Sequence, residues 1–278
     1  MQQALSRSNI IKYTLLILYV LLIALPLFVV IIPTFQTVQE SSKGIFTRPT
    51  QLNLSNYIEA WNQSNFPLAF RNSVIITGST IVITGFLGAL AAFPIGIRYR
   101  VRLFRNVFFT FLAGLMLPFQ SIMIPMYILM GRTLRLTNTF IGIIMVYVAM
   151  TLPLTVFLYS QFIADISREM EEAAVVDGCG YFKMFWAIYF PLLKPVTAAI
   201  VIQNMLFLWN DLLVPLILID KAPTKPIMPM VYVFFGSYYN QWNLAFSVLL
   251  LAALPFVILF LLLQKQFIAG MSMGAVKG

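Results

Sequence analysis

Apolar residues along this chain fall into long blocks, and they do not alternate with polar residues at the spacing of a half-buried strand or an amphipathic helix. Six blocks of about 20 residues can be delimited, since that is the length of helix that crosses a hydrocarbon core of about 30 Å. They lie near residues 13–32, 74–97, 107–130, 140–159, 196–219 and 244–263. The pattern predicts an all-α polytopic membrane protein with six transmembrane helices, in which residues 1–278 form a single transmembrane domain.

Composition and charge fix the class of protein and its orientation. Because 60% of the residues are hydrophobic and 10% are charged, too little polar surface remains to cover a soluble globule. The first block has a basic start but no small-residue cleavage site after it, so we expect a retained anchor. With the N-terminus inside, 11 of the 18 Lys and Arg residues lie on the inner side, four of them in "RYRVRLFRN". The positive-inside rule then predicts an N-in, C-in topology in the cell (inner or plasma) membrane, with residues 33–72 outside and 161–195 in the cytoplasm.

Other classes of site are disfavoured by residue content. The net charge of +9 is spread over membrane-flanking segments and forms no basic soluble face, so we expect no nucleic-acid partner. The chain has one cysteine, Cys179, and no histidine, which excludes an intrachain disulfide and disfavours a metal site. We expect no catalytic residue, no bound metal and no cofactor on this chain.

Polar residues in or beside the apolar blocks are candidates for a substrate pathway, because hydrocarbon disfavours them unless they face the bundle interior or water. The candidates are Asn72, Gln120, Asn204, Asn210 and Asp211. Asn204 and Asp211 are seven residues apart and are predicted to share one helix face. Two interpretations stay open for each amide, substrate contact or helix packing. Asp211 either belongs to a pathway or gate, or lies near the outer surface where its burial is less costly.

The predicted cytoplasmic loop contains the longest informative motif, "EEAAVVDGCGYFKMFWAIYFPLLKP", residues 171–195. Ser167 can cap a short helix whose first turns carry Glu171 and Glu172, where the helix dipole favours carboxylates. Gly178 stands where that helix can end in a left-handed residue, and Gly180 repeats the option. Residues 181–190 are aromatic and apolar, which predicts a second, buried short helix. Residue types alone leave open whether this is a rigid docking element or an incidental interfacial loop.

The loop resembles the EAA loop of ABC importer permeases, in which Glu-Ala-Ala is followed by Gly six residues after the Glu and then by Ile-x-Leu-Pro. The matching residues are Glu172, Ala173, Ala174, Gly178, Ile188 and Pro191, with Phe190 in place of the Leu. The likeness extends over nearly the whole chain through residues 70–95, 136–144, 209–218 and 264–278. The chain resembles the shorter, MalG-like permease of the type I, carbohydrate-uptake subfamily of binding-protein-dependent inner-membrane components.

The resemblance implies a transport subunit without catalytic residues. Its expected partners are a second homologous permease, two ATP-binding subunits that carry ATP and Mg²⁺, an extracytoplasmic solute-binding protein, a carbohydrate substrate and the lipid bilayer. It implies that the first loop helix is a coupling helix seated in a cleft of the ATP-binding subunit. The implied coupling residues are Glu171, Glu172, Ala173, Ala174, Asp177, Gly178 and Pro191, with a further contact from Gly274 and Lys277 in the tail.

Three alternatives accompany this interpretation. The importer could carry a solute other than a sugar, since the EAA motif gives no information on the transported substrate. An ion-coupled secondary carrier is the second alternative, and Asp211 is its best support. An intramembrane enzyme is the third, but it requires paired acids, a Ser/Lys pair or metal ligands at membrane depth, and none is visible in the blocks.

Overall fold

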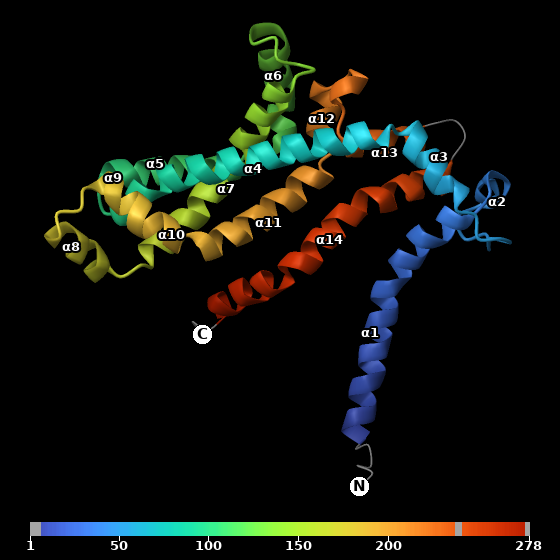
Figure 1. Cartoon of the computed structure of the whole chain (residues 1–278), viewed down its shortest axis with the longest axis horizontal. Helices are drawn as coiled ribbons and strands as arrows, with labels where there is room; N and C mark the ends of the chain where they lie inside the picture. Colours follow the sequence, from blue (N-terminus) through green and yellow to red (C-terminus); the bar gives the residue numbers. More distant parts are fainter. Residues whose placement is uncertain (1–6, 237–240, 276–278) are drawn as a thin grey trace. The chain divides into compact units, whose positions relative to one another are not determined.

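The computed structural model describes residues 7–236 and 241–275, and all regular secondary structure in these two ranges is helical (Figure 1). This confirms the predicted all-α class. Contacts group the chain into two compact units where the sequence predicted one domain, Met1–Pro67 with Met230–Val257 and Leu68–Pro229 with Ile258–Gly278. The division arises because the external loop builds a polar core of its own with the start of the last helix.

The first unit contains the N-terminal helix and the external loop. Its elements are α1 (Arg7–Ile31), a 3₁₀ turn (Ile32–Phe35), α2 (Val38–Lys43) and α3 (Ser55–Gln63), together with parts of α13 (Ile227–Gly236) and α14 (Trp242–Ala275). The apolar side chains of α1 are exposed, as expected of a helix that faces lipid. Helix α3 begins at Ser55, whose backbone N–H donates to Asn53 Oδ1 at 3.0 Å.

Buried amides hold the external loop together. The Asn56 amide donates to the carbonyls of Thr34 and Gln36, both at 2.8 Å. Asn243, at the start of α14, donates through its side chain to Asn56 Oδ1 at 2.9 Å and through its backbone to Ser41 Oγ at 3.3 Å. All five residues are at least nine-tenths buried, so these bonds act in a low dielectric and fix the loop against α14.

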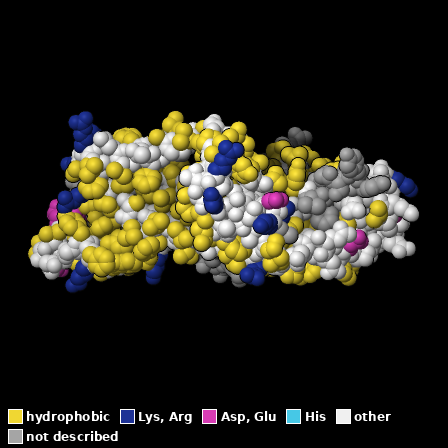
Figure 2. Space-filling view, turned by 90° about the horizontal axis from the view of Figure 1, so that it is seen from above, with side chains coloured by type: hydrophobic (Ala, Val, Ile, Leu, Met, Phe, Trp, Pro, Cys, Tyr) yellow, Lys and Arg dark blue, Asp and Glu magenta, His cyan; other side chains and the backbone are white. Residues whose placement is uncertain are grey.

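The second unit contains most of the predicted spans and the cytoplasmic loop. Its elements are α4 (Phe66–Ile97, which starts in the first unit), α5 (Arg102–Leu115), α6 (Phe119–Ile128), a π-helical turn (Leu129–Thr133), α7 (Phe140–Ala164), α8 (Arg168–Val176), α9 (Tyr181–Met184), a second π-helical turn (Phe185–Tyr189), α10 (Phe190–Leu192), α11 (Lys194–Asn210) and α12 (Leu213–Leu218). Hydrophobic side chains cover much of the face seen in Figure 2, as expected of a protein surrounded by lipid.

Glycines allow α4 and α7 to pack closely. A Cβ on Gly88 would lie 2.5 Å from Thr155 Cγ2, and one on Gly96 would lie 2.6 Å from Ile163 Cγ2. Both distances are shorter than real carbon–carbon contacts, so a side chain at either position would force a neighbouring group to move.

Length and composition identify three helices among the described residues that can cross a membrane, within Lys12–Phe35, Phe66–Ile97 and Phe140–Ala164. Two bent pairs also qualify when each is taken as one span, Arg102–Leu115 with Phe119–Thr133 and Tyr181–Leu192 with Lys194–Asn210, bent by 96° and 68°. The predicted block at 107–130 is therefore an interrupted helix, and the block at 196–219 is interrupted at Asp211, between α11 and α12. Pro118 and Asp211 both have extended backbone at the interruptions, which ends the preceding helix locally.

Candidate functional site

The cytoplasmic loop begins with the helix that the motif predicts. Ser167 is the N-cap of α8, and its hydroxyl accepts from the backbone N–H of Glu169 at 3.3 Å. Glu169 and Glu171 lie in the first turn, where unpaired backbone N–H groups favour negative charge. The sequence interpretation of this helix start is confirmed.

The two faces of α8 differ in what they contact. Ala174 is 6% exposed and packs into the core formed with α4 and the following helices. Glu172 and Ala173 are exposed, and so are Val175 and Val176, at 56% and 87%. The outward face thus combines acidic and small apolar groups, while Ala174 belongs to the inward face.

The elbow after α8 is a Schellman motif built on Gly178. The N–H of Cys179 donates to the Ala174 carbonyl at 2.8 Å and that of Gly178 to the Val175 carbonyl at 3.0 Å. Gly178 has a φ of +70°, which disfavours any residue with a side chain. Gly180 has a φ of −68° and begins α9, so the second left-handed option offered by the sequence is not used.

The aromatic segment forms the predicted second helix and fastens it to α4. Met184, Phe185 and Tyr189 are at most 3% exposed. The Phe93 ring of α4 meets the rings of Phe185 and Tyr189 edge to face at centroid distances of 5.3 and 5.1 Å. Pro191 lies inside α10 on an exposed surface, and the bend to α11 comes after it, at residue 193.

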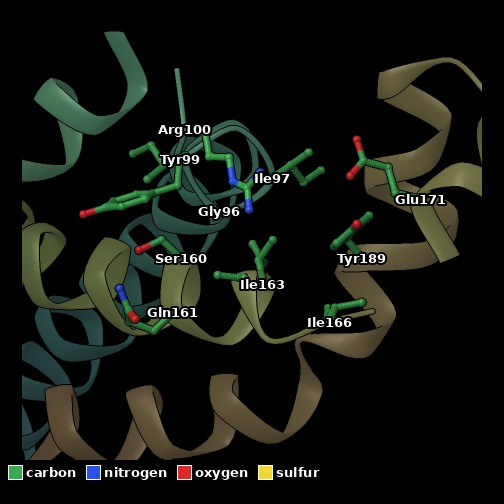
Figure 3. Close-up of a pocket in the computed structure, with 12 residues that line it drawn as sticks. Gly96, Ile97, Tyr99, Arg100, Ser160, Gln161, Ile163, Ile166, Glu171 and Tyr189 are labelled. Carbon is green, nitrogen blue, oxygen red and sulfur yellow. The ribbon is translucent and has the colours of Figure 1, made fainter. Parts of the chain in front are cut away.

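A cavity of about 330 Å³ separates α8 from the end of α4 (Figure 3). Arg100 follows α4 and enters the cavity from one wall, while Glu171 of α8 lies on the opposite wall next to Tyr189. Ser160 and Gln161 of α7 line the remaining side. The charged groups at this end of the unit are also close together on the surface (Figure 2).

A second polar feature runs along α7, where four hydroxyl groups recur every fourth residue and face α4 and α11. They belong to Tyr147, Thr151, Thr155 and Tyr159. Their partners are Asp211 (Tyr147 Oη to Oδ2, 2.8 Å), Thr84 (Oγ1 to Thr151 Oγ1, 3.1 Å), Asn204 (Nδ2 to Thr155 Oγ1, 3.3 Å) and Thr197 (Oγ1 to Tyr159 Oη, 2.9 Å). Sequence reasoning missed this row, although the four-residue spacing was its signal.

Asp211 is a capping residue between helices. Its carboxylate accepts from the N–H groups of Leu213 at 3.3 Å and Val214 at 3.1 Å, at the start of α12, as well as from Tyr147. Because α11 ends at Asn210, Asp211 does not share a helix face with Asn204. That sequence prediction is wrong, since the helix does not continue through both residues.

The other candidate pathway residues separate into buried and exposed ones. Asn72 is fully buried and its amide donates to the carbonyls of Pro223 and Lys225, both at 3.0 Å. Gln120 and Asn210 are exposed. In the tail, Gly274 lies in the last turn of α14 and Lys277 lies outside the described residues.

Asn138 is a further residue that sequence reasoning did not single out. It has a φ of +62°, which asparagine tolerates better than most residues. Its Oδ1 accepts from the N–H groups of Asp220 and Lys221 at 2.7 and 2.8 Å, and its own N–H donates to the Leu218 carbonyl at 2.8 Å. Asn138 therefore fastens the segment before α7 to the segment after α12.

The family model for the binding-protein-dependent transport system inner membrane component matches residues 84–273. The chain belongs to this family. It is thus the permease subunit of an ABC importer, an inner-membrane protein that is not itself catalytic and that works with an ATPase and a binding protein.

Individual relatives cover nearly the whole permease. It is 39% identical over 239 residues to the melibiose/raffinose/stachyose import permease protein MelC of Bacillus subtilis (strain 168), covering 86% of this chain and 85% of that one. It is 32% identical over 269 residues to the probable starch degradation products transport system permease protein AmyC of Thermoanaerobacterium thermosulfurigenes, covering 96% and 97%. A chain in the crystal structure of a bacterial ABC transporter involved in the import of the acidic polysaccharide alginate has the same fold, with a TM-score of 0.77 at 20% identity over 95% of this permease and 99% of that chain.

Family membership sets aside the ion-coupled carrier and the intramembrane enzyme as interpretations of this permease. The geometry of Asp211 agrees, because its carboxylate accepts three hydrogen bonds from the permease's own groups. Among the described residues, no group of three or more His, Cys, Asp or Glu side chains is arranged to hold a metal ion.

Proposed function

We propose that this permease is one of two homologous membrane subunits of an ATP-driven carbohydrate importer, with two ATP-binding subunits on the cytoplasmic side and oligosaccharides as its substrates. The single observation that carries the substrate class is the likeness to MelC, whose name specifies melibiose, raffinose and stachyose. AmyC, named for starch degradation products, supports the same class.

The substrate test is uptake by the reconstituted importer. We expect binding-protein-dependent, ATP-driven accumulation of at least one of stachyose, raffinose, melibiose or maltotriose in proteoliposomes, blocked by omission of ATP. Accumulation of an amino acid or peptide with no uptake of any sugar would overturn the carbohydrate assignment and leave the importer assignment in place.

The same proposal assigns α8 as the coupling helix. Its outward face offers carboxylates and small side chains to a partner, and Gly178 sets the direction of the elbow. We expect Glu172→Lys to abolish association with the ATP-binding subunits by placing like charges together, if the partner cleft is basic. Gly178→Val should do the same because a β-branched residue is strained at a φ of +70°.

Gly180→Ala is the matched control for the elbow. A Cβ on Gly180 would meet no atom within 4 Å, and the residue has an ordinary negative φ, so alanine fits there. Co-purification of ATP-binding subunits with tagged permease measures the effect, and membrane insertion is checked in parallel. Normal association and uptake in both Glu172→Lys and Gly178→Val would remove the coupling assignment.

We further propose six spans with both termini inside, made by α1, α4, α5 with α6, α7, α11 with α12, and α14. The support is the three long apolar helices and the bent pair of α5 with α6, which is permitted where neighbouring helices cover the broken backbone. The spans of α11 with α12 and of α14 follow the apolar blocks at 196–219 and 244–263. Single cysteines in a Cys179→Ser background test this topology. Residues in 44–52 should react with an impermeant thiol reagent in intact cells, and residues in 168–176 should react only after permeabilisation.

The exposed amides of Gln120 and Asn210 are our candidates for the substrate pathway, since hydrocarbon tolerates an exposed amide poorly. The Asn210 amide donates to the Leu206 carbonyl at 2.8 Å, which leaves its oxygen and its second N–H for substrate. Asn72 and Asn204, which are buried and donate to groups of this chain, are expected to affect folding more than substrate affinity. A change in KM for sugar confined to variants of Gln120 and Asn210 is the expected result.

A further inference from the structure

The turn at residues 98–101 and helix α8 face each other across an open gap. Two cavities of about 330 and 610 Å³ occupy it, and both are lined by Ile97, Arg100 and Glu171. The gap therefore runs along α8 beside Glu171, Glu172, Val175 and Val176, and it is large enough to hold several water molecules.

The two sides of the gap carry opposite charges. The turn contributes Arg98 and Arg100, and α8 contributes Glu171 and Glu172. In Figure 3 the Arg100 guanidinium and the Glu171 carboxylate extend from opposite walls into the smaller cavity. No ion pair joins these two sides in the part of the chain that the structure describes, although their charges are complementary.

Helix α8, which carries Glu171, has few buried contacts, whereas the turn that carries Arg100 is bonded to α9. Among the described side chains of α8, Ala174 alone is buried, and a Cβ on either elbow glycine, Gly178 or Gly180, would meet no atom within 4 Å. Arg98, in contrast, donates to the Tyr181 hydroxyl and lies over its ring at 4.9 Å, which joins the turn to α9. Helix α8 can thus move about the elbow while the turn and α9 stay together.

We propose that Arg100 and Glu171 are positioning residues that form an ion pair when the ATP-binding subunits press α8 toward the turn, and that they are separated in the open arrangement of Figure 3. The proposal rests on the assignment of α8 as the coupling helix. Closure expels water from the gap, which lowers the local dielectric and strengthens the attraction between the two charges. The pair would then bias α8 between two positions, which is what a coupling element requires.

The proposal assigns different partners to the two neighbouring glutamates, Glu171 and Glu172. Glu171 is partly buried and lines both cavities, so it serves the permease's own turn. Glu172 is exposed and lines only the larger cavity, so it stays available to the ATP-binding subunit.

A charge swap tests the pair in the complete reconstituted importer. We expect Arg100→Glu and Glu171→Arg each to lower the sugar transported per ATP hydrolysed at least about fivefold, the lower end of typical coupling effects. The double variant R100E/E171R should recover at least half of the original ratio, because it restores opposite charges across the gap. A double variant no better than either single variant overturns the pair.

Arg102→Glu is the matched control, because Arg102 is exposed, lies in the same basic segment and lines neither cavity. It makes the same change in the positive-inside balance as Arg100→Glu and should leave the transport ratio within twofold. If Arg100→Glu and Arg102→Glu lower the transport ratio equally, the effect comes from altered membrane topology, and the proposed Arg100–Glu171 ion pair is refuted.

A crosslink measures the movement directly and does not depend on activity. In a Cys179→Ser background, the R100C/E171C pair should form a disulfide several-fold faster in the vanadate-trapped, nucleotide-bound complex than in the nucleotide-free one, since the bond requires Cα atoms within about 7 Å. Equal rates in the two states, or no bond in either, would contradict closure of the gap.

Failure of this proposal is distinguishable from failure of the coupling assignment. If Glu172→Lys abolishes association with the ATP-binding subunits while the charge swap shows no recovery, α8 remains the coupling helix and the ion pair is refuted. If Glu172→Lys and Gly178→Val both show normal association and uptake, the coupling assignment itself fails, and the proposed pair fails with it.

Discussion

Replacing Gly88 by alanine tests whether α4 and α7 depend on the close approach that glycine permits. The new Cβ would lie 2.5 Å from Thr155 Cγ2 and 3.3 Å from Thr155 Cβ, so one side chain must move. Thr155 cannot turn away freely. Its hydroxyl donates to the Thr151 carbonyl at 3.0 Å and accepts from the Asn204 amide at 3.3 Å.

The expected magnitude follows from these contacts. Forcing a methyl group into a packed interior costs about 1–3 kcal/mol. Loss of one interhelical hydrogen bond within a membrane adds about 0.6 kcal/mol. The higher helix propensity of alanine offsets about 1 kcal/mol of this. The net destabilisation is about 0.6–2.6 kcal/mol, and the middle of this range corresponds to a decrease in Tm of roughly 5 °C for a chain of this size.

Thermal unfolding of the detergent-purified permease measures this prediction. Gly85→Ala is the control on the same helix face, because its Cβ would lie at an ordinary 3.9 Å from Tyr159 Oη. Thr155→Ser removes the clashing Cγ2 and keeps the hydroxyl, so G88A/T155S should regain most of the lost Tm. An unchanged Tm in Gly88→Ala, or a loss equal to that of Gly85→Ala, would refute the close-packing argument.

Three further predictions concern polar positions. Asp211→Ala should destabilise the permease by about 1–3 kcal/mol, because it removes the acceptor for two backbone N–H groups and the Tyr147 phenol, while uptake stays independent of ion gradients. Asn138→Gly, which keeps the positive φ, should lower the Tm less than Asn138→Ala. Hydrogen bonds from Thr50 and Thr37 lower the pKa of Glu40 from 4.5 to about 2, so the external loop should lose stability as the pH falls from about 4.5 toward 2.

Each of these predictions has its own check. For Glu40, the depressed pKa means that the folded loop favours the charged carboxylate, so stability is fully present above the unfolded value and is lost below it. Hydrogen exchange at residues 37–50 should accelerate over that pH window, and Glu40→Gln should abolish the pH dependence. Uptake by Asp211→Ala that no longer depends on ATP would contradict the capping role of Asp211. Equal Tm values for Asn138→Gly and Asn138→Ala would contradict the role of the positive φ at Asn138.

Local signals in the sequence account for what it predicted well. Long apolar blocks indicated the positions of α1, α4, α7 and the start of α14, because a helix in lipid must satisfy its own backbone and needs no partner to be recognised. The start of α8 and the elbow after it depend on residues near one another in sequence. Ser167 and Gly178 could therefore be assigned from residue type alone.

Features that depend on distant partners could not be predicted. The apolar pattern continues through residues 116–118, so it does not indicate that α5 stops there. At the end of α11 the polar pair Asn210 and Asp211 interrupts the block, but residue type alone does not distinguish a helix end from a polar site within a continuous helix. The separate polar core of the external loop depends on Asn243 reaching Asn56, 187 residues away. Because the two asparagines are so far apart in the sequence, neither segment alone indicates that they form a hydrogen bond.

The polar residues of the apolar blocks show why residue type alone overestimates a pathway. Each amide or acid in hydrocarbon requires a partner, and the structure supplies one from the same chain for Asn204 and Asp211. A residue whose donors and acceptors are already bonded within its own chain has little capacity left for substrate. Gln120 and Asn210 lie on surfaces that this chain leaves exposed and lipid cannot hydrogen-bond, although the Asn210 amide also donates one hydrogen bond to the Leu206 carbonyl at 2.8 Å. An amide on such a surface favours contact with a second subunit or water, which is why we propose these two residues for sugar contacts.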